Sequence, residues 1–239
     1  MPQTKLLQLR QSALDIFHSA LRSVDAKEVT RGAITFEQGN VRIVDTLIEA
    51  DKPIYALAIG KAAAPMAQAI DELLRDRIRS GVITCPAGTG SDLRRTWKRF
   101  HGGHPLPNTD SLSAAEAAFT ILEKANADKG TVIFAISGGG SAMIEWPVTR
   151  DIPLSDLQEA NRVLVTCGAT IAEVNTVRRA FSGVKGGKLA SRASNAQQIT
   201  LIISDTNRGD EANVASGPTL IPSSSSNAPQ VVGPLRLRS

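Results

Sequence analysis

Three short stretches of this chain combine residue types that suit the binding of an anion. Residues 137–141 read Ser-Gly-Gly-Gly-Ser, Lys61 follows a glycine, and Asp205 follows a serine. Glycines let a backbone approach a ligand closely, and successive N–H groups ahead of a helix start attract phosphate. The sequence therefore predicts a phosphate-binding turn at residues 137–141, with an ordinary tight turn as the alternative.

Lys61 and Asp205 add charges of opposite sign. A lysine at the end of a strand reaches an anion as a compact point charge. A carboxylate beside a phosphate-binding loop can hold Mg²⁺ or orient a hydroxyl nucleophile. The alternative roles are an exposed surface lysine and a carboxylate that caps the loop at Gly209.

Residues 173–188 form a basic segment. It contains the pair Arg178 and Arg179, followed by a second glycine-assisted turn, Lys185 to Lys188. An arginine fork with nearby backbone amides suits a carboxylate or a phosphate. A solvated helix that ends in a glycine cap is the alternative interpretation.

The elements that must position these residues alternate between strands and helices. Apolar runs predict strands at 54–59, 81–84, 94–101, 131–136 and 199–203. Periodic apolar positions predict helices at 6–26, 62–79, 110–127, 155–167 and 170–181, and residues 41–50 are expected to be a connecting segment. This alternation predicts an α/β fold, a Rossmann-like parallel sheet with helices on both faces. Ligands bind at the carboxyl ends of such strands, where the three stretches fall.

Composition excludes several other classes of protein. The net charge is +4, but aromatic residues make up only 4% and do not interleave with the basic clusters, so we expect no nucleic-acid partner. No apolar run approaches the ~20 residues of a membrane helix, and the start lacks a signal peptide, so we expect a cytoplasmic protein without membrane contact. Cys85 and Cys167 are expected to be structural.

Five motifs resemble those of class II glycerate kinases, the glycerate 2-kinases of the MOFRL family, some of which are labelled hydroxypyruvate reductases. They are G-K-A-A at 60–63, G-H-P-L-P-N at 103–108, S-G-G-G-S-A at 137–142, E-V-N-T-V-R-R with its continuation at 173–190, and A-S-G-P-T at 215–219. The resemblance covers about residues 10–221 in the same order. One loop departs from the family pattern, because Gly209-Asp210 lies one place later after Asp205.

The resemblance implies phosphorylation of D-glycerate at its 2-hydroxyl to 2-phosphoglycerate, with ATP and Mg²⁺. Lys61 and Asp205 would be catalytic, with Asp205 also the metal ligand. The cofactor-binding residues would be Ser137, Gly138, Gly139, Gly140 and Ser141. The substrate-binding residues would be Glu173, Asn175, Arg178 and Lys185.

The resemblance also sets the expected domain organisation. Residues 1–221 would form the family's N-terminal Rossmann-like domain, and the serine- and proline-rich residues 222–239 a disordered or aberrant tail. We expect the family's C-terminal domain, the second wall of the cleft, to be absent from this truncated chain. Water exclusion and positioning would then be poor, which leaves turnover in doubt. The exposed apolar patch would allow a homodimer.

Three other functions remain open. A hydroxypyruvate reductase that uses NAD(P)H would need a dinucleotide fingerprint, and the turn at 137–141 lacks its glycine spacing. A non-catalytic short form that binds anions would need no second domain. A serine hydrolase that uses residues 101–103 and Ser141 would need a G-x-S-x-G elbow, which is missing.

Overall fold

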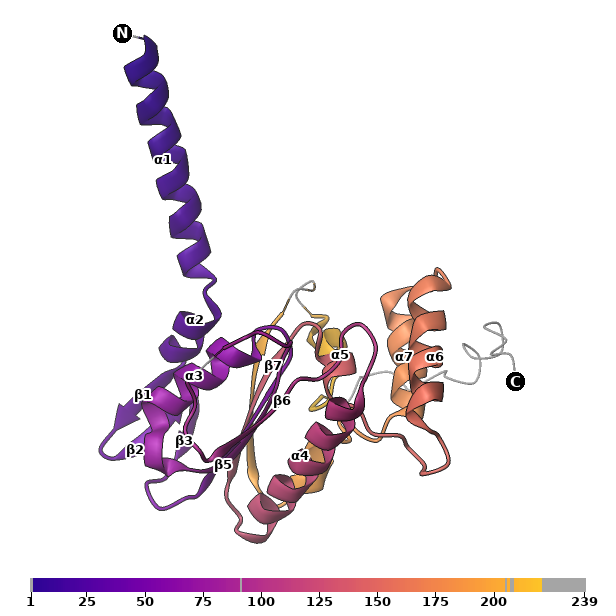
Figure 1. The fold of residues 1–239 in the computed structure, drawn as a ribbon. Helices are drawn as coiled ribbons and strands as arrows, with labels where there is room; N and C mark the ends of the chain where they lie inside the picture. Colours follow the sequence, from indigo (N-terminus) through magenta and orange to yellow (C-terminus); the bar gives the residue numbers. More distant parts are fainter. Residues whose placement is uncertain (1, 91, 205, 207–208, 221–239) are drawn as a thin grey trace.

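The computed structural model describes residues 2–90, 92–204, 206 and 209–220. Figure 1 shows a central sheet flanked by helices, a small separate sheet, and a long helix that projects from one end. The predicted tail at 222–239 and the predicted catalytic residue Asp205 both lie outside the described residues.

The central sheet has five parallel strands in the order β6-β5-β4-β7-β8. The strands are β4 (Ile54–Ile59), β5 (Ile78–Thr84), β6 (Trp97–Phe100), β7 (Thr131–Ser137) and β8 (Gln197–Ile203). Every residue of β4 and β7 is buried, as expected for central strands covered on both faces. The predicted α/β fold with a Rossmann-like parallel sheet is confirmed.

Apolar side chains fill both faces of this sheet. Alternate residues of β4 point to opposite sides, so Leu57 packs in one buried cluster and Ala56 in the other. The first cluster lies under α4 (Thr109–Ala127) and the short η2 (Ala190–Ala193) and η3 (Glu211–Ser216). The second lies under α3 (Ala63–Leu74), which is followed by η1 (Arg75–Arg77).

A three-stranded antiparallel sheet packs on the α3 side. Its strands are β1 (Ile34–Glu37), β2 (Asn40–Ile43) and β3 (Thr46–Ile48). The predicted connecting segment at 41–50 is therefore wrong. The strands are only three or four residues long, too short for a clear periodicity, yet Val41, Ile43 and Ile48 are fully buried in the cluster beneath α3. The signal that could have found them is the two-residue turn Gln38-Gly39, whose φ angles of 49° and 84° suit a hairpin.

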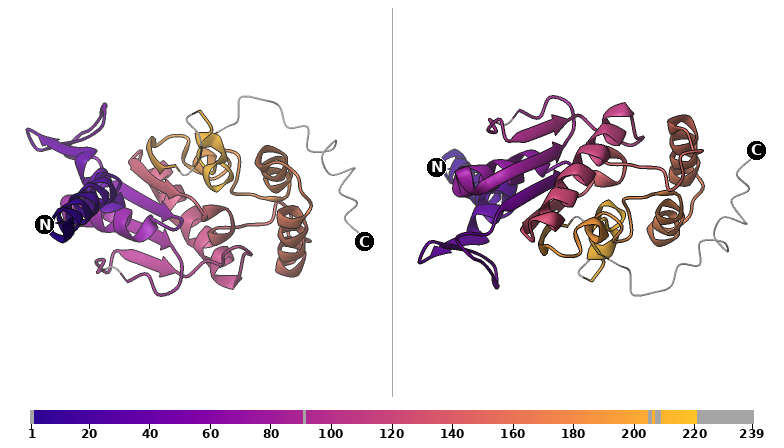
Figure 2. Two further views of the ribbon diagram at one scale, coloured as in Figure 1. Left: turned by 90° about the horizontal axis from the view of Figure 1, so that it is seen from above. Right: turned by 90° about the horizontal axis from the view of Figure 1, so that it is seen from below.

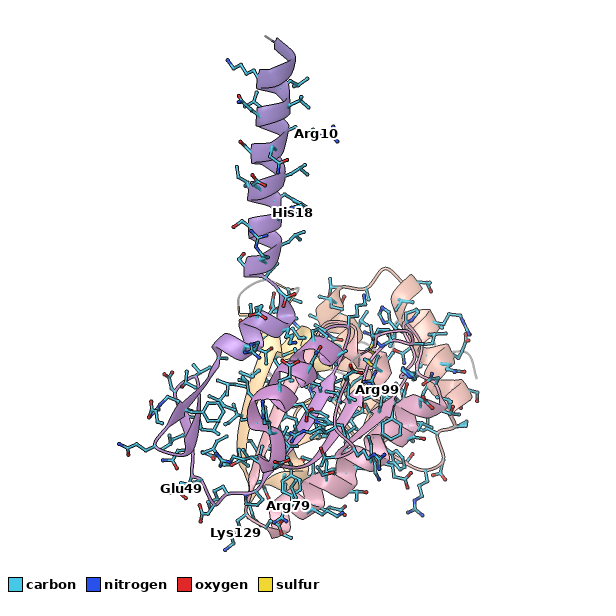
Figure 3. The ribbon with its side chains drawn as sticks, turned by 60° about the vertical axis from the view of Figure 1, so that its left-hand side comes forward. Arg10, His18, Glu49, Arg79, Arg99 and Lys129 are labelled. Atoms are coloured by element: carbon cyan, nitrogen blue, oxygen red, sulfur yellow. The ribbon has the colours of Figure 1, made fainter. Side chains whose placement is uncertain are left out.

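The predicted helix at 6–26 is confirmed up to residue 23, where the first helix ends. α1 (Pro2–Ser23) ends before Asp25, whose side chain accepts the Glu28 N–H at 2.9 Å and so caps α2 (Ala26–Gly32). α1 extends away from the rest of the molecule, with the labelled Arg10 and His18 far from the sheet (Figure 3). No helix in the described part of the chain has the length and apolar composition needed to cross a bilayer.

Two further helices form a separate pair. They are α6 (Leu154–Thr166) and α7 (Ile171–Phe181), joined to the sheet through the four-residue α5 (Gly140–Met143). Figure 2 shows them at the opposite side of the molecule from the small sheet. They match the helices predicted at 155–167 and 170–181 within one residue at each end.

Candidate functional site

A cavity of about 370 Å³ opens at the carboxyl ends of β4, β7 and β8. Six residues predicted from the sequence line it: Lys61, Gly138, Gly139, Ser141, Asn175 and Arg178. The remaining lining residues are His104, Pro105, Ala142, Val165, Ile171, Thr206, Asn213, Val214 and Ala215. Of the other predicted residues in the described part of the chain, Ser137, Gly140, Glu173 and Lys185 lie outside the lining.

Hydrogen bonds join the glycine turn to the turn that carries Lys61. The Lys61 N–H donates to the Gly138 carbonyl oxygen at 2.9 Å, and the Ala62 N–H donates to Ser137 Oγ at 3.0 Å. Gly60 makes this close approach possible, because a Cβ there would lie 2.4 Å from the Ser137 carbonyl oxygen. The two predicted anion-binding stretches therefore form one structural unit. Within it, the Ser137 hydroxyl accepts a hydrogen bond from the Ala62 N–H.

The segment at residues 215–217 packs against the glycine turn and bonds to it through Ser216. Ala215, Ser216 and Gly217 all have left-handed φ angles, of 51°, 61° and 66°. The Ser216 hydroxyl lies 2.8 Å from Ser141 Oγ and donates to Asn175 Oδ1, also at 2.8 Å. Non-glycine residues adopt this conformation at a cost, so the surrounding contacts must hold it in place. The fully buried Ser216 was missed as a site residue, although it belongs to the motif A-S-G-P-T.

The two adjacent arginines have different surroundings. Arg178 lines the cavity, and its Nε donates to Asn161 Oδ1 of α6 at 2.9 Å. Burial lowers the pKa of Arg178, an effect that the charge of Glu145 opposes. Arg179 instead holds the backbone of η3, because its Nη2 donates to the Ala212 carbonyl oxygen at 2.8 Å.

Glu173 and Lys185 bond to protein groups away from the cavity. The Glu173 carboxylate accepts both the N–H and the hydroxyl of Thr170 at 2.8 Å, completing the capping box of α7, and these bonds lower its pKa. The Lys185 ammonium is buried against the Glu145 carboxylate. Burial lowers the pKa of Lys185, and the neighbouring carboxylate opposes that change. Their substrate-binding roles stay predictions.

His104 was not among the predicted site residues, although the motif G-H-P-L-P-N contains it. Its side chain borders the cavity together with Lys61 and Arg178. Partial burial, and then the charges of these two cations, lower the pKa of His104. These surroundings therefore favour the uncharged imidazole. The described lining of the cavity combines donors for an anion with this one imidazole.

Known proteins resemble this chain over most of its length. The family profile described as "Domain of unknown function (DUF4147)" matches residues 12–238. A "Glycerate 2-kinase" from Pyrococcus horikoshii is 36% identical over 214 residues, which are 90% of this chain and 47% of that protein. A "Putative hydroxypyruvate reductase" from Agrobacterium vitis is 35% identical over 212 residues, 88% of this chain and 45% of that protein.

A solved structure shares the fold. The crystal structure of a "Glycerate kinase" from Thermotoga maritima superposes with a TM-score of 0.81 at 28% identity, over 97% of this chain and 53% of that chain. The chain thus spans about half the length of the relatives it matches.

Proposed function

The chain belongs to the DUF4147 family, and on this basis we propose that it acts as a glycerate kinase. The kinase would transfer the γ-phosphoryl group of ATP to the 2-hydroxyl of D-glycerate and so form 2-phosphoglycerate. The observation that carries this proposal is the meeting of the glycine turn, Lys61 and Arg178 at one cavity. Relatives from Pyrococcus horikoshii and Thermotoga maritima, named "Glycerate 2-kinase" and "D-glycerate 2-kinase", support the same reaction.

The phosphate groups of ATP suit the glycine turn. Gly138 and Gly139 line the cavity without side chains, so backbone N–H groups can approach a phosphate oxygen. Lys61 lies beside them. Its positive charge would stabilise the negative charge that develops on the phosphate oxygens during phosphoryl transfer. Ser141 offers a hydroxyl at the same edge.

Glycerate suits the side of the cavity formed by α7. Arg178 is anchored through Nε by Asn161, so the rest of its guanidinium can face a carboxylate. Asn175 and Asn213 also line this side and can bond to hydroxyl groups. The 2-hydroxyl would then lie toward Lys61.

The described residues of the cavity lining supply some of the oxygen ligands that a Mg²⁺ ion needs. Ser141, Thr206 and Asn213 supply the hydroxyl and amide oxygens of the lining. Mg²⁺ in kinases usually also takes one or two carboxylates. Asp205, next to Thr206 in the chain, would supply one. Bound there, the ion would neutralise charge on the phosphates.

The test is product formation by the purified chain. Incubation with ATP, Mg²⁺ and D-glycerate should yield 2-phosphoglycerate, resolved from 3-phosphoglycerate by ³¹P NMR. Lys61→Ala should lower the rate at least about tenfold, since one positioned charge contributes a few kcal/mol. Lys124→Ala, on the exposed surface of α4, should leave the rate unchanged.

Three outcomes would overturn the proposal. Formation of 3-phosphoglycerate alone would exclude the 2-hydroxyl as the acceptor. Oxidation of NAD(P)H with hydroxypyruvate would favour the reductase named for the Agrobacterium relative. Binding of ATP or glycerate without turnover would favour a non-catalytic anion-binding protein.

A further inference from the structure

Among the described residues that line the cavity, one side chain can take up a proton near neutral pH. Among the described residues that line it, Lys61 and Arg178 are cations, and the other polar groups are hydroxyls and amides. None of these described residues is a carboxylate. Cations donate hydrogen bonds, and hydroxyls and amides are not bases at this pH. The imidazole of His104 is the remaining base.

The loop that carries His104 is held firmly in place. The Gly103 N–H donates to Asn108 Oδ1 and Ser111 Oγ, both at 3.0 Å. A Cβ on Gly102 would lie 2.1 Å from the Met143 carbonyl oxygen, so the loop packs directly on the end of α5. The position of His104 at the cavity is therefore set by the loop backbone.

The charged groups that face His104 come from two elements. Lys61 lies in the turn after β4 and Arg178 lies on α7, and both act on the imidazole through their positive charge. The other helical elements that border the cavity are α5, α6 and η3. Their described lining residues are all uncharged: Ser141, Ala142, Val165, Asn213, Val214 and Ala215. With no anion bound, both neighbours disfavour an imidazolium ion.

We propose that His104 takes up a proton when an anion enters this cavity. The proposal rests on the anion-binding cavity of the proposed function. A bound anion neutralises the field of Lys61 and Arg178 and attracts the imidazolium directly. The protonated ring then donates an N–H to the anion, as a third cationic contact. Because linkage is reciprocal, protonation of His104 strengthens anion binding to the same extent.

The test follows the three histidines of the full chain by NMR. His18, His101 and His104 give three titration curves, and sulfate is the probe because its charge is constant through neutral pH. Saturating sulfate should raise the titration midpoint of His104 by about one pH unit or more. The signals of His18 and His101, which do not line the cavity, are the controls and should not respond to sulfate. Sulfate affinity should fall about tenfold across the titration as the pH rises.

Matched variants separate His104 from general effects. His104→Gln should remove the pH dependence of sulfate binding between pH 6 and 8, whereas His101→Gln should keep it. Should His104→Gln fail to fold, the NMR titration of the unaltered chain still decides. Sulfate binding that depends on Lys61 but leaves the His104 midpoint unchanged would overturn this inference alone.

The remaining outcomes distinguish the inference from the proposed function. Absence of sulfate and phosphate binding would remove the anion-binding cavity and with it both proposals. A His104 midpoint that responds to sulfate in a chain that forms no 2-phosphoglycerate would support the inference while the kinase proposal fails.

Discussion

The carboxylate of Glu145 and the ammonium group of Lys185 form a buried ion pair, in which the side chains are 3% and 1% exposed. The pair joins the segment after α5 to the loop after α7. The Ser182 hydroxyl donates to Glu145 Oε1 at 2.6 Å and satisfies a further oxygen of the pair. Both charged groups are shielded from water, so each is stabilised mainly by the opposite charge of its partner.

Removing one partner of this pair should strongly destabilise the fold. Glu145→Gln leaves a buried ammonium without its counter-charge, and we expect a loss of about 3–5 kcal/mol in the free energy of unfolding. The double variant Glu145→Leu, Lys185→Met should lose less. Urea denaturation measures both. Glu37→Gln, at an exposed ion pair with Arg42, is the control and should cost far less stability, because water screens exposed charges. A Glu145→Gln loss no larger than that of the control would contradict the prediction.

The sequence predicted the fold well where burial alone decides it. β4 and β7 are continuous apolar runs, which only central strands of a covered parallel sheet require. The short strands β1 to β3 are the exception, since each buries one or two side chains and depends on contacts with α3. Such tertiary contacts leave little signal in three or four residues.

The sequence predicted the site in part. Lys61 and the glycine turn were expected to meet because neighbouring parallel strands end at one edge. Lys185 was predicted to bind the substrate from a second glycine-assisted turn. Its burial against Glu145 was not foreseen, because it depends on a residue 40 positions away in the chain. His104 and Ser216 were missed for the same reason, because segments far apart in the chain bring His104 to the cavity and Ser216 to Ser141 and Asn175.

Replacing Gly139 with alanine should weaken ligand binding, in addition to the loss of stability caused by backbone strain. Gly139 and Gly88 have nearly equal φ angles, +82° and +81°, so alanine at either should cost about 1–2 kcal/mol of stability. A Cβ at Gly139 would meet Lys61 Cγ at 3.0 Å, whereas nothing lies within 4 Å of one at Gly88. Gly139→Ala should therefore weaken phosphate binding about tenfold, or ~1.4 kcal/mol, by calorimetric titration. Equal effects of Gly139→Ala and Gly88→Ala on binding would argue against this contact.

Substitution of Arg178 should mainly weaken phosphate binding, whereas substitution of Arg179 should mainly lower the stability of the fold. Arg178→Gln removes a charged donor at the cavity, and we expect about 10–100-fold weaker phosphate binding, from ~1.5–3 kcal/mol. Arg179→Gln removes bonds to the backbone of η3 and should lower the free energy of unfolding by about 1–3 kcal/mol. Calorimetry and urea denaturation on the same two proteins measure this contrast. The prediction fails if Arg179→Gln weakens binding more than Arg178→Gln.

Tyr55 should make stability depend on alkaline pH. Burial, and then its hydrogen bond to Asp128, raise the pKa of Tyr55 from 10.0 to about 12. The unfolded chain therefore loses this proton first as the pH rises, so stability present below pH 10 is lost between about pH 10 and 12. Tyr55 is the single tyrosine, so tyrosinate absorbance reports it directly. Tyr55→Phe should lack this loss, and a titration midpoint near 10 in the folded chain would contradict the assignment.

The projecting helix α1 should promote self-association. Leu7 and Phe17 are 65% and 57% exposed on a helix that meets the rest of the chain only near α2. An isolated amphipathic helix is marginal in water, so pairing of its apolar face with a second copy is the expected outcome. Replacing Leu7, Phe17 and Leu21 with glutamine should shift sedimentation toward the monomer and leave the unfolding midpoint of the body unchanged. Replacing the polar Gln11 and Ser19 with alanine is the control, and a monomeric unaltered chain at the same concentration would refute the prediction.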